Sequence, residues 1–272
     1  MLRDAADDIE VFMVKRHGSS DVLGGVYVFP GGKMDGADAD PDILQRLGAP
    51  LAALHSALGE AEIDALTAAG LFVAACRETF EEAGILLAAD ASARHVAEAQ
   101  RRARAGVAFG AIVAQLGLAL NWNSVIPWTR WITPPIPSDM KKRFDTRFFL
   151  AVAPNDQEAR HDDHEATGSF WLRPRVVLER YWEDRITLAP PQIMSLVALA
   201  RHTRVADVVA AARGLKPPII QPEPFMYEQR RAVAFPGNAS HPVSKRAIVG
   251  PSFLVYRNKR YEPGEGFDAF FA

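Results

Sequence analysis

Two stretches of this sequence decide the fold: Arg77-Glu78-Thr79-Phe80-Glu81-Glu82-Ala83-Gly84-Ile85 and, upstream of it, Phe29-Pro30-Gly31-Gly32. In the longer stretch Glu78 and Glu82 are spaced i,i+4, and Glu78 and Glu81 are spaced i,i+3, so a helix projects all three carboxylates from one face. Like charges at this spacing repel by about 0.2–0.5 kcal/mol per pair, and a cation that takes oxygen ligands offsets that cost. The pattern indicates an acidic, metal-binding helix face. The alternative is a solvated acidic helix.

These residues resemble the Nudix box of the diphosphate hydrolases. The family pattern is Gly, five residues, Glu, seven residues, and then Arg-Glu-apolar-x-Glu-Glu-x-Gly-apolar. Here Arg77 lies 45 positions after Gly32 (77 − 32), against 14 in the family pattern, so 31 extra residues interrupt the box. The family's first Glu falls on Asp38, and Thr79 stands where the family has an apolar residue.

The interruption itself points to one branch of the family. A box split by a long insert resembles the long-insert branch that includes the peroxisomal coenzyme A diphosphatase. The segments Trp128–Pro134 and Arg143–Phe149 also resemble that branch. The resemblance covers about residues 9–212.

The resemblance implies an α/β fold: a Nudix α/β/α sandwich with a mixed sheet, a helical insert at about residues 37–70 and a C-terminal extension. It implies a hydrolase that depends on Mg²⁺ or Mn²⁺. The implied catalytic residues are Arg77, Glu78, Glu81 and Glu82, and the implied metal ligands are Glu78, Glu81, Glu82 and Gly32. Arg77 points to another side of the helix than the glutamates, and the resemblance implies that it orients a box glutamate and the glycine turn.

The branch implies coenzyme A or an acyl-coenzyme A as substrate, cleaved to 3′,5′-ADP and 4′-phosphopantetheine or its acyl form. The alternatives are an ADP-ribose or dinucleotide pyrophosphatase and a non-catalytic Nudix-fold protein that binds a nucleotide as a regulator. Candidate substrate-binding residues are Arg16, Gly31 and Arg143, and Glu165 is a candidate distal acid. Lys141 and Lys142 are further phosphate candidates, whereas His161 and His164 are expected in a polar loop.

Composition narrows the class of partner. The net charge of −2 over 272 residues gives no general polyanion-binding surface, so the expected partner is a small nucleotide and not a nucleic-acid polymer. No apolar run reaches the length of a membrane span, and residues 1–10 are acidic and lack a signal-peptide core. The final Phe270-Phe271-Ala272 is not a peroxisomal address, and we expect a cytoplasmic protein. The single Cys76 excludes an internal disulfide and is expected to be a buried, inert thiol.

Hydrophobic periodicity and the residues that typically start and end helices and strands predict the remaining secondary structure. Strands are expected at residues 9–15, 26–29, 125–132, 144–153 and 170–172, and a further strand is expected to start at residues 85–87. Helices are expected at 61–83, 92–105, 110–118, 190–201 and 206–213, with a further helix starting near Asp40-Pro41-Asp42. Gly84 is expected to end the acidic helix as a left-handed cap.

A change in composition at residue 215 divides the chain into an expected Nudix domain, residues 1–214, and a C-terminal arm, residues 215–272. Pro217-Pro218 and Pro222-x-Pro224 suggest an extended linker, and Asn258-Lys259 suggests a hairpin turn. We expect the arm to pack on the body or on the partner subunit of a homodimer.

Overall fold

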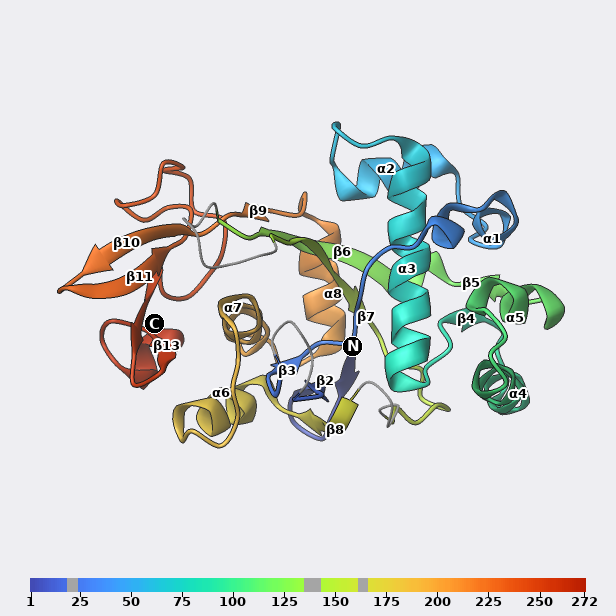
Figure 1. The fold of residues 1–272 in the computed structure, drawn as a ribbon, viewed down its shortest axis with the longest axis horizontal. Coiled ribbons are helices and arrows are strands. Elements are labelled where there is room, and N and C mark those ends of the chain that lie inside the picture. The colour runs from blue at the N-terminus through green and yellow to red at the C-terminus, as the bar shows by residue number, and fades with distance from the viewer. Residues whose placement is uncertain (19–23, 135–142, 161–165) are drawn as a thin grey trace.

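The computed structural model describes residues 1–18, 24–134, 143–160 and 166–272. It is a mixed α/β structure (Figure 1). Its helices are α1 (Pro41–Gln45), α2 (Leu51–Leu58), α3 (Ala65–Ala83), α4 (Ala93–Arg104), α5 (Phe109–Gln115), α6 (Pro174–Trp182), α7 (Pro190–Leu199) and α8 (Val205–Arg213). Three short 3₁₀ helices cover Gly36–Ala39, Trp122–Ser124 and Phe267–Phe270.

Two sheets form the centre of the molecule. In the first, β2 (Ile9–Arg16) pairs antiparallel with β1 (Leu2–Asp4), β3 (Tyr27–Val28) and β8 (Ala166–Leu172). In the second, β6 (Val125–Ile132) pairs antiparallel with β7 (Asp145–Ala151) and parallel with β9 (Ile219–Ile220). A parallel bridge between Leu2 and Val152 joins the two sheets.

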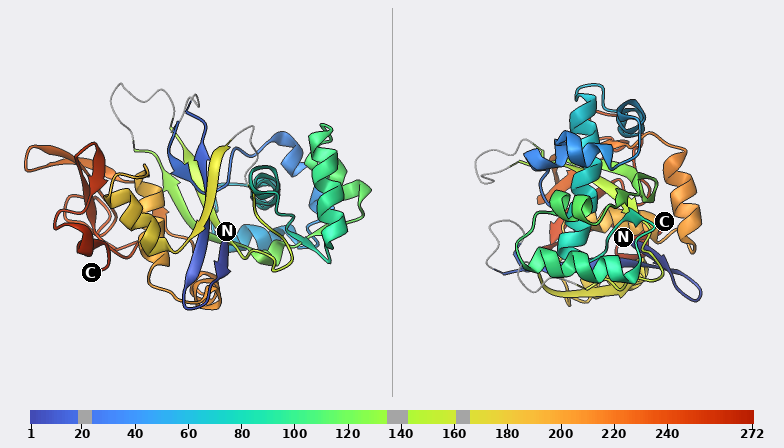
Figure 2. Two further views of the ribbon diagram at one scale, coloured as in Figure 1. Left: turned by 90° about the horizontal axis from the view of Figure 1, so that it is seen from below. Right: turned by 90° about the vertical axis from the view of Figure 1, so that its right-hand side faces the viewer.

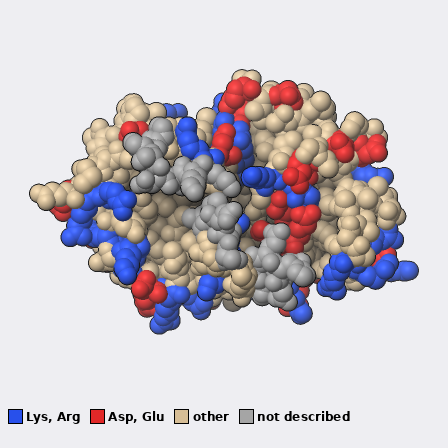
Figure 3. All heavy atoms as spheres, viewed as in Figure 1, with Lys and Arg blue, Asp and Glu red and all other residues tan. Residues whose placement is uncertain are grey.

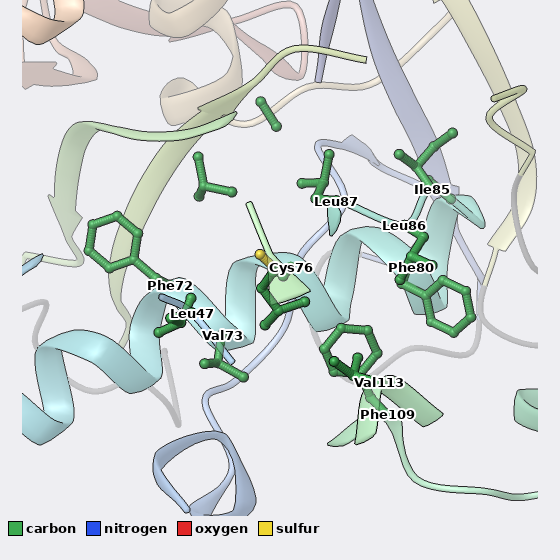
Figure 4. Packing of buried hydrophobic residues seen from close by; sticks show 14 of the residues in the cluster. Leu47, Phe72, Val73, Cys76, Phe80, Ile85, Leu86, Leu87, Phe109 and Val113 are labelled. Carbon is green, nitrogen blue, oxygen red and sulfur yellow. The ribbon is translucent and has the colours of Figure 1, made fainter. Parts of the chain in front are cut away.

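Helices cover both faces of these sheets. Seen from two directions, α3 lies on one side and α6 with α7 on the other (Figures 1 and 2). One apolar cluster forms around α3 and includes Phe72, Cys76 and Phe80, with Phe109 from α5 (Figure 4). A second cluster lies on the α7 side and includes Met13, Leu196 and Tyr181. The layered arrangement agrees with the α/β expectation from the sequence.

The C-terminal region is built into the second cluster. Its strands β10 (Glu223–Tyr227), β11 (Arg230–Ala234), β12 (Phe253–Arg257) and β13 (Arg260–Glu262) form an antiparallel meander, and β12 and β13 meet at the expected Asn258-Lys259 turn. Phe235 and Phe270 are fully buried in the cluster. The expected linker contains β9, because Arg130 N donates to Pro218 O at 2.9 Å and the next residues pair with β6.

One predicted strand starts at Ala88 and not at residues 85–87, where it was expected to begin. Residues 85–87 are buried but irregular, and the short β4 (Ala88–Ala89) follows them and pairs with β5 (Ala119–Leu120). The Gln157 side chain takes the place of a neighbouring strand there. It accepts from Leu86 N at 2.8 Å and donates to Leu86 O at 3.1 Å.

Candidate active site

Helix α3 is fixed at both ends. The Asp64 side chain accepts from Thr67 N at 2.7 Å and caps the first turn, and Gly84 ends the helix with a φ of 69°. The apolar side carries Phe72, Val73, Cys76 and Phe80 into the core (Figure 4). Because this side is buried, the rotation of the helix is set, and the glutamates of its last two turns face the opposite way. Acidic side chains gather on that face of the molecule, where α3 lies in Figure 1 (Figure 3).

The split box closes in space. Gly31 N donates to Glu82 Oε2 at 2.9 Å, across 51 residues of chain. A Cβ on Gly32 would overlap the Glu78 carboxylate, so only glycine lets the turn approach the helix this closely. The glycine turn and the acidic helix therefore meet as one site.

Arg77 connects the parts of this site. Its guanidinium holds Asp38 with two hydrogen bonds, Nε to Oδ1 at 2.9 Å and Nη2 to Oδ2 at 3.0 Å. The Nη1 group donates to Glu78 at 2.7 Å and to Glu81 at 2.8 Å, and Nη2 also donates to Lys33 O at 2.8 Å. Arg77 thus contacts two box glutamates and the residue that follows the glycine turn.

The electrostatics keep Arg77 charged. Burial by itself lowers the pKa of an arginine, but the hydrogen bonds to Asp38 and Glu81 and the charge of Glu78 outweigh it and raise the pKa of Arg77 above its ordinary value. The guanidinium is therefore a permanent positive charge among the carboxylates of Asp38, Glu78 and Glu81.

Asp38 is the site residue that the sequence analysis did not select. Its side chain is 2% exposed, and besides Arg77 it contacts Asp35, whose backbone N–H donates to Asp38 Oδ2 at 2.8 Å. The signal was present, because the family's first Glu falls on Asp38 when the count starts at Gly32. The shorter aspartate reaches Arg77 because the 3₁₀ helix Gly36–Ala39 brings its backbone against α3.

The three box glutamates divide into two environments. Glu82 is buried and Glu78 is half-buried, and both lie against the glycine turn. Glu81 is exposed and contacts Arg77, which also holds Glu78. Within the described ranges, no group of three or more His, Cys, Asp or Glu side chains is arranged to hold a metal ion. The site offers Glu78, Glu82 and the backbone oxygens of the turn, which suits Mg²⁺, an ion that uses one or two carboxylates together with water and substrate phosphate.

Thr79, the departure from the apolar box position, is buried. Its hydroxyl donates to Ala75 O at 2.7 Å, so the polar atom is satisfied within the helix. The substitution therefore leaves α3 and its carboxylates in place.

For the other candidates the structure gives local contacts only, or does not describe them. Arg16 ends β2, where its backbone N–H donates to Val26 O, and Arg143 is exposed and donates twice to Thr133 O. Cys76 is buried, and burial together with the nearby Asp38 charge raises the pKa of its thiol to about 12. The candidates Lys141, Lys142, His161, His164 and Glu165 fall outside the described residues.

The tryptophans have separate surroundings. Trp131 is buried against Phe235, with ring centroids 5.8 Å apart, and Trp128 packs at the edge of the same cluster. Trp122 borders a cavity of about 330 Å³ between α2, β6 and the end of α8. The lining of this cavity contains no box residue, so it is separate from the acidic site.

A second ion-pair network, which the sequence analysis also missed, joins the 37–70 segment to the second sheet. Arg130 on β6 pairs with Glu60 at 2.8 Å, with Asp145 at 2.7 Å and with Glu62. Arg147 on β7 pairs with Glu60 at 2.6 Å. Glu60 is only 5% exposed, so two arginines compensate one buried carboxylate. The network anchors the start of α3.

The chain is similar to known Nudix proteins. The family model described as the NUDT19 Nudix domain matches residues 55–199. The chain is 26% identical over 239 residues to acyl-coenzyme A diphosphatase NUDT19 of Xenopus laevis, covering 74% of this chain and 62% of that protein. It is 26% identical over 240 residues to the Gallus gallus protein of the same name, covering 74% and 64%.

A solved structure agrees with these matches. The crystal structure of a NUDIX hydrolase from Alicyclobacillus acidocaldarius is 28% identical, with a TM-score of 0.60, and the match covers 77% of this chain and 91% of that one. The chain spans about 62–64% of the length of the two curated relatives. No helix within the described ranges has the length and apolar character that crossing a membrane requires. With the family model matching more than half of its residues, and with the glycine turn closed on the acidic helix, the chain belongs to the NUDT19 family of Nudix hydrolases.

Proposed function

We propose that the protein is a divalent-metal-dependent diphosphatase that cleaves coenzyme A or an acyl-coenzyme A. The products are 3′,5′-ADP and 4′-phosphopantetheine or its acyl form. The observation that carries the proposal is the contact of Gly31 with Glu82 beside Glu78, because it assembles the box from two distant segments. The substrate class is supported by the relatives, which are named acyl-coenzyme A diphosphatases.

The chain's own residues supply the arrangement for this reaction. Glu78 and Glu82, with backbone oxygens of the glycine turn, would hold Mg²⁺ or Mn²⁺, which neutralises charge on the diphosphate and lowers the pKa of bound water. Arg77 keeps Glu78 in place and fixes the position of Lys33. Glu81, also held by Arg77, is the third acidic group of the site.

The reaction is a simple displacement. A water oxygen attacks one phosphorus of the pyrophosphate bridge, and the bond from that phosphorus to the bridging oxygen breaks. Two phosphate monoesters form, and the two protons of the water pass to the monoester oxygens or to solvent. The rigid α3 contributes by positioning, which is most of what phosphoryl transfer asks of a protein.

A substrate panel tests the proposal. Purified protein with Mg²⁺ or Mn²⁺ is assayed against coenzyme A, an acyl-coenzyme A, ADP-ribose and NADH, beside Glu82→Gln. We expect the coenzyme A compounds to be the best substrates and Glu82→Gln to lower turnover by at least about 10²-fold while the circular dichroism spectrum is kept. If ADP-ribose or NADH is cleaved best, the proposed coenzyme A substrate is wrong. If the compounds bind but none is cleaved, the protein is a nucleotide-binding regulator. Near-normal activity of Glu82→Gln would show that the active site has been assigned wrongly.

A further inference from the structure

The face of the first sheet that lies on the α6–α7 side carries an unusual group of side chains. Lys15 pairs with Tyr27 on one neighbouring strand and with Gly168 on the other, so these three residues share one face. Phe170, two residues beyond Gly168, and Phe29, two residues beyond Tyr27, continue it. Phe148 from β7 and Arg180 from α6 border the same group. We call these side chains the aromatic surface: Lys15, Tyr27, Phe29, Phe148, Phe170 and Arg180.

The rings of the aromatic surface are paired but are not sealed into the core. Tyr27 and Phe170 have centroids 4.9 Å apart, and Phe29 and Phe148 have centroids 6.0 Å apart. All four side chains are half-buried, unlike neighbouring Val28 and Met13, which are buried. These rings pack against the second cluster on one side, and half-buried aromatic rings are groups on which nucleic-acid bases can stack.

Two cations stand over these rings. Lys15 Nζ lies 6.0 Å from the Tyr27 centroid, and the Arg180 guanidinium lies 5.8 Å from the Phe170 centroid. Neither cation has a carboxylate partner within the described residues, whereas Arg77, Arg130 and Arg147 all do. The surface therefore combines stacking area with uncompensated positive charge, and a phosphorylated nucleoside supplies the complement of both.

There is also room on this face. No atom of the described residues lies within 4 Å of the position that a Cβ on Gly168 would take, in a strand next to Lys15. A glycine inside a strand weakens it and often marks a close approach of a ligand. Here the missing side chain opens the sheet face between Lys15 and Phe170.

The aromatic surface is tied to the acidic site by a short length of chain. Phe29 precedes Gly31 by two residues, a backbone distance of at most about 7 Å, and Gly31 contacts Glu82. A diphosphate at the glutamates would therefore have its nucleoside within reach of the rings.

We propose that the aromatic surface binds the adenosine 3′-phosphate part of the substrate. The base stacks on Tyr27 and Phe170 over the gap at Gly168, and Lys15 and Arg180 bind the 3′-phosphate. This inference rests on the proposed function, since it assigns the nucleotide end of the same substrate.

Calorimetry with 3′,5′-ADP and metal-free protein tests the inference without turnover. Gly168→Leu fills the gap and Tyr27→Leu removes a ring, and we expect each to weaken binding about tenfold or more. Lys15→Gln should weaken 3′,5′-ADP but leave 5′-AMP, which lacks the 3′-phosphate, nearly unchanged. Gly110→Leu on α5, whose Cβ would only touch Ile43, is the matched control and should bind normally.

The outcomes separate this inference from the proposed function. If the wild-type protein does not bind 3′,5′-ADP, or if Gly168→Leu, Tyr27→Leu and Lys15→Gln all bind it normally, the inference is overturned, whatever the activity. If the variants behave as expected but no diphosphate is cleaved, the binding surface stands and the proposed hydrolysis fails. Normal cleavage of coenzyme A with an unchanged KM in the variants would leave the hydrolase intact and remove the base-binding role. Should Gly168→Leu fail to fold, the Tyr27 and Lys15 variants decide.

Discussion

Arg77 and Asp38 form a two-point ion pair across 39 residues, with contacts of 2.9 Å and 3.0 Å, although the chain between them is the segment that interrupts the box. The carboxylate is almost wholly buried, and the same guanidinium also holds two box glutamates. The pair is therefore both a structural clamp and a support for the acidic site.

Removal of this clamp should be costly. Arg77→Ala leaves Asp38 as a buried charge without its main partner, and we expect a loss of about 3 kcal/mol in the free energy of unfolding. Urea denaturation measures the change. The control is Arg185→Ala, which breaks an exposed pair with Glu183 and should cost less than about 1 kcal/mol. Equal losses in the two variants would contradict the clamp.

Gly32 should tolerate no side chain. In Gly32→Ala the new methyl overlaps the Glu78 carboxylate, so the turn or the glutamate must move. A displacement of about 1 Å can lower turnover by roughly 10²-fold, and we expect a loss of that order. Initial rates of coenzyme A hydrolysis measure it. Gly36→Ala, where nothing lies within 4 Å of the added methyl, should keep its activity. An active Gly32→Ala enzyme would show that this approach is not needed.

Cys76 should be unreactive in the folded protein. Burial raises the pKa of its thiol to about 12, so a thiol reagent at pH 8 should label it only as fast as the protein unfolds. Because the folded pKa lies above the unfolded value of about 8.5, the thiol's contribution to stability is complete below pH 8.5 and is lost as the pH rises toward 12. Labelling followed by mass spectrometry measures the first effect, and alkaline denaturation of Cys76→Ala measures the second. Rapid labelling of native protein would refute the buried assignment.

Within the second ion-pair network, Glu60 should contribute more to stability than Glu62. Glu60→Gln removes the buried charge between Arg130 and Arg147, and we expect a loss of about 3 kcal/mol in the free energy of unfolding. Glu62→Gln, at the exposed rim of the same network, should change stability far less. Thermal unfolding of the two variants measures the difference. A larger loss of stability in Glu62→Gln would show that Glu60 is not the main carboxylate of the network.

The same network should make the free energy of unfolding depend on pH under acidic conditions. The Arg130 hydrogen bond lowers the pKa of Asp145 below its ordinary value. A lowered pKa contributes stability above the unfolded value of about 3.9, and this contribution is lost as the pH falls through the folded value. Acid unfolding of Asp145→Asn should therefore begin from a lower stability and show a shallower loss below pH 4.

Local signals made α3 predictable. Its acidic spacing, the apolar face with Phe72 and Phe80 and the cap at Gly84 all act within the helix, and the structure confirms them. The hairpin at Asn258-Lys259 was found for the same reason, since Asn is a common residue at positive φ. The β10–β11 hairpin was missed because Glu228-Gln229 adopt positive φ without such a signal.

Long-range contacts were not predictable from one sequence. The irregular 85–87 segment depends on Gln157, which lies 71 residues from Leu86. The buried Glu60 depends on Arg147, 87 residues away. Helix α6, by contrast, carried a local signal in Pro174 at its first position, which the sequence analysis did not use.

The contact between the two halves of the interrupted box also has a consequence for the length of the segment that separates them. The entropy of joining the ends of a flexible loop grows only with the logarithm of its length, so lengthening this connection from the family spacing of 14 to 45 residues costs about 1 kcal/mol. Two contacts, at Glu82 and at Asp38, hold the two ends of this connection together. Lineages can therefore enlarge, trim or replace the intervening segment while the hydrolytic centre keeps its geometry.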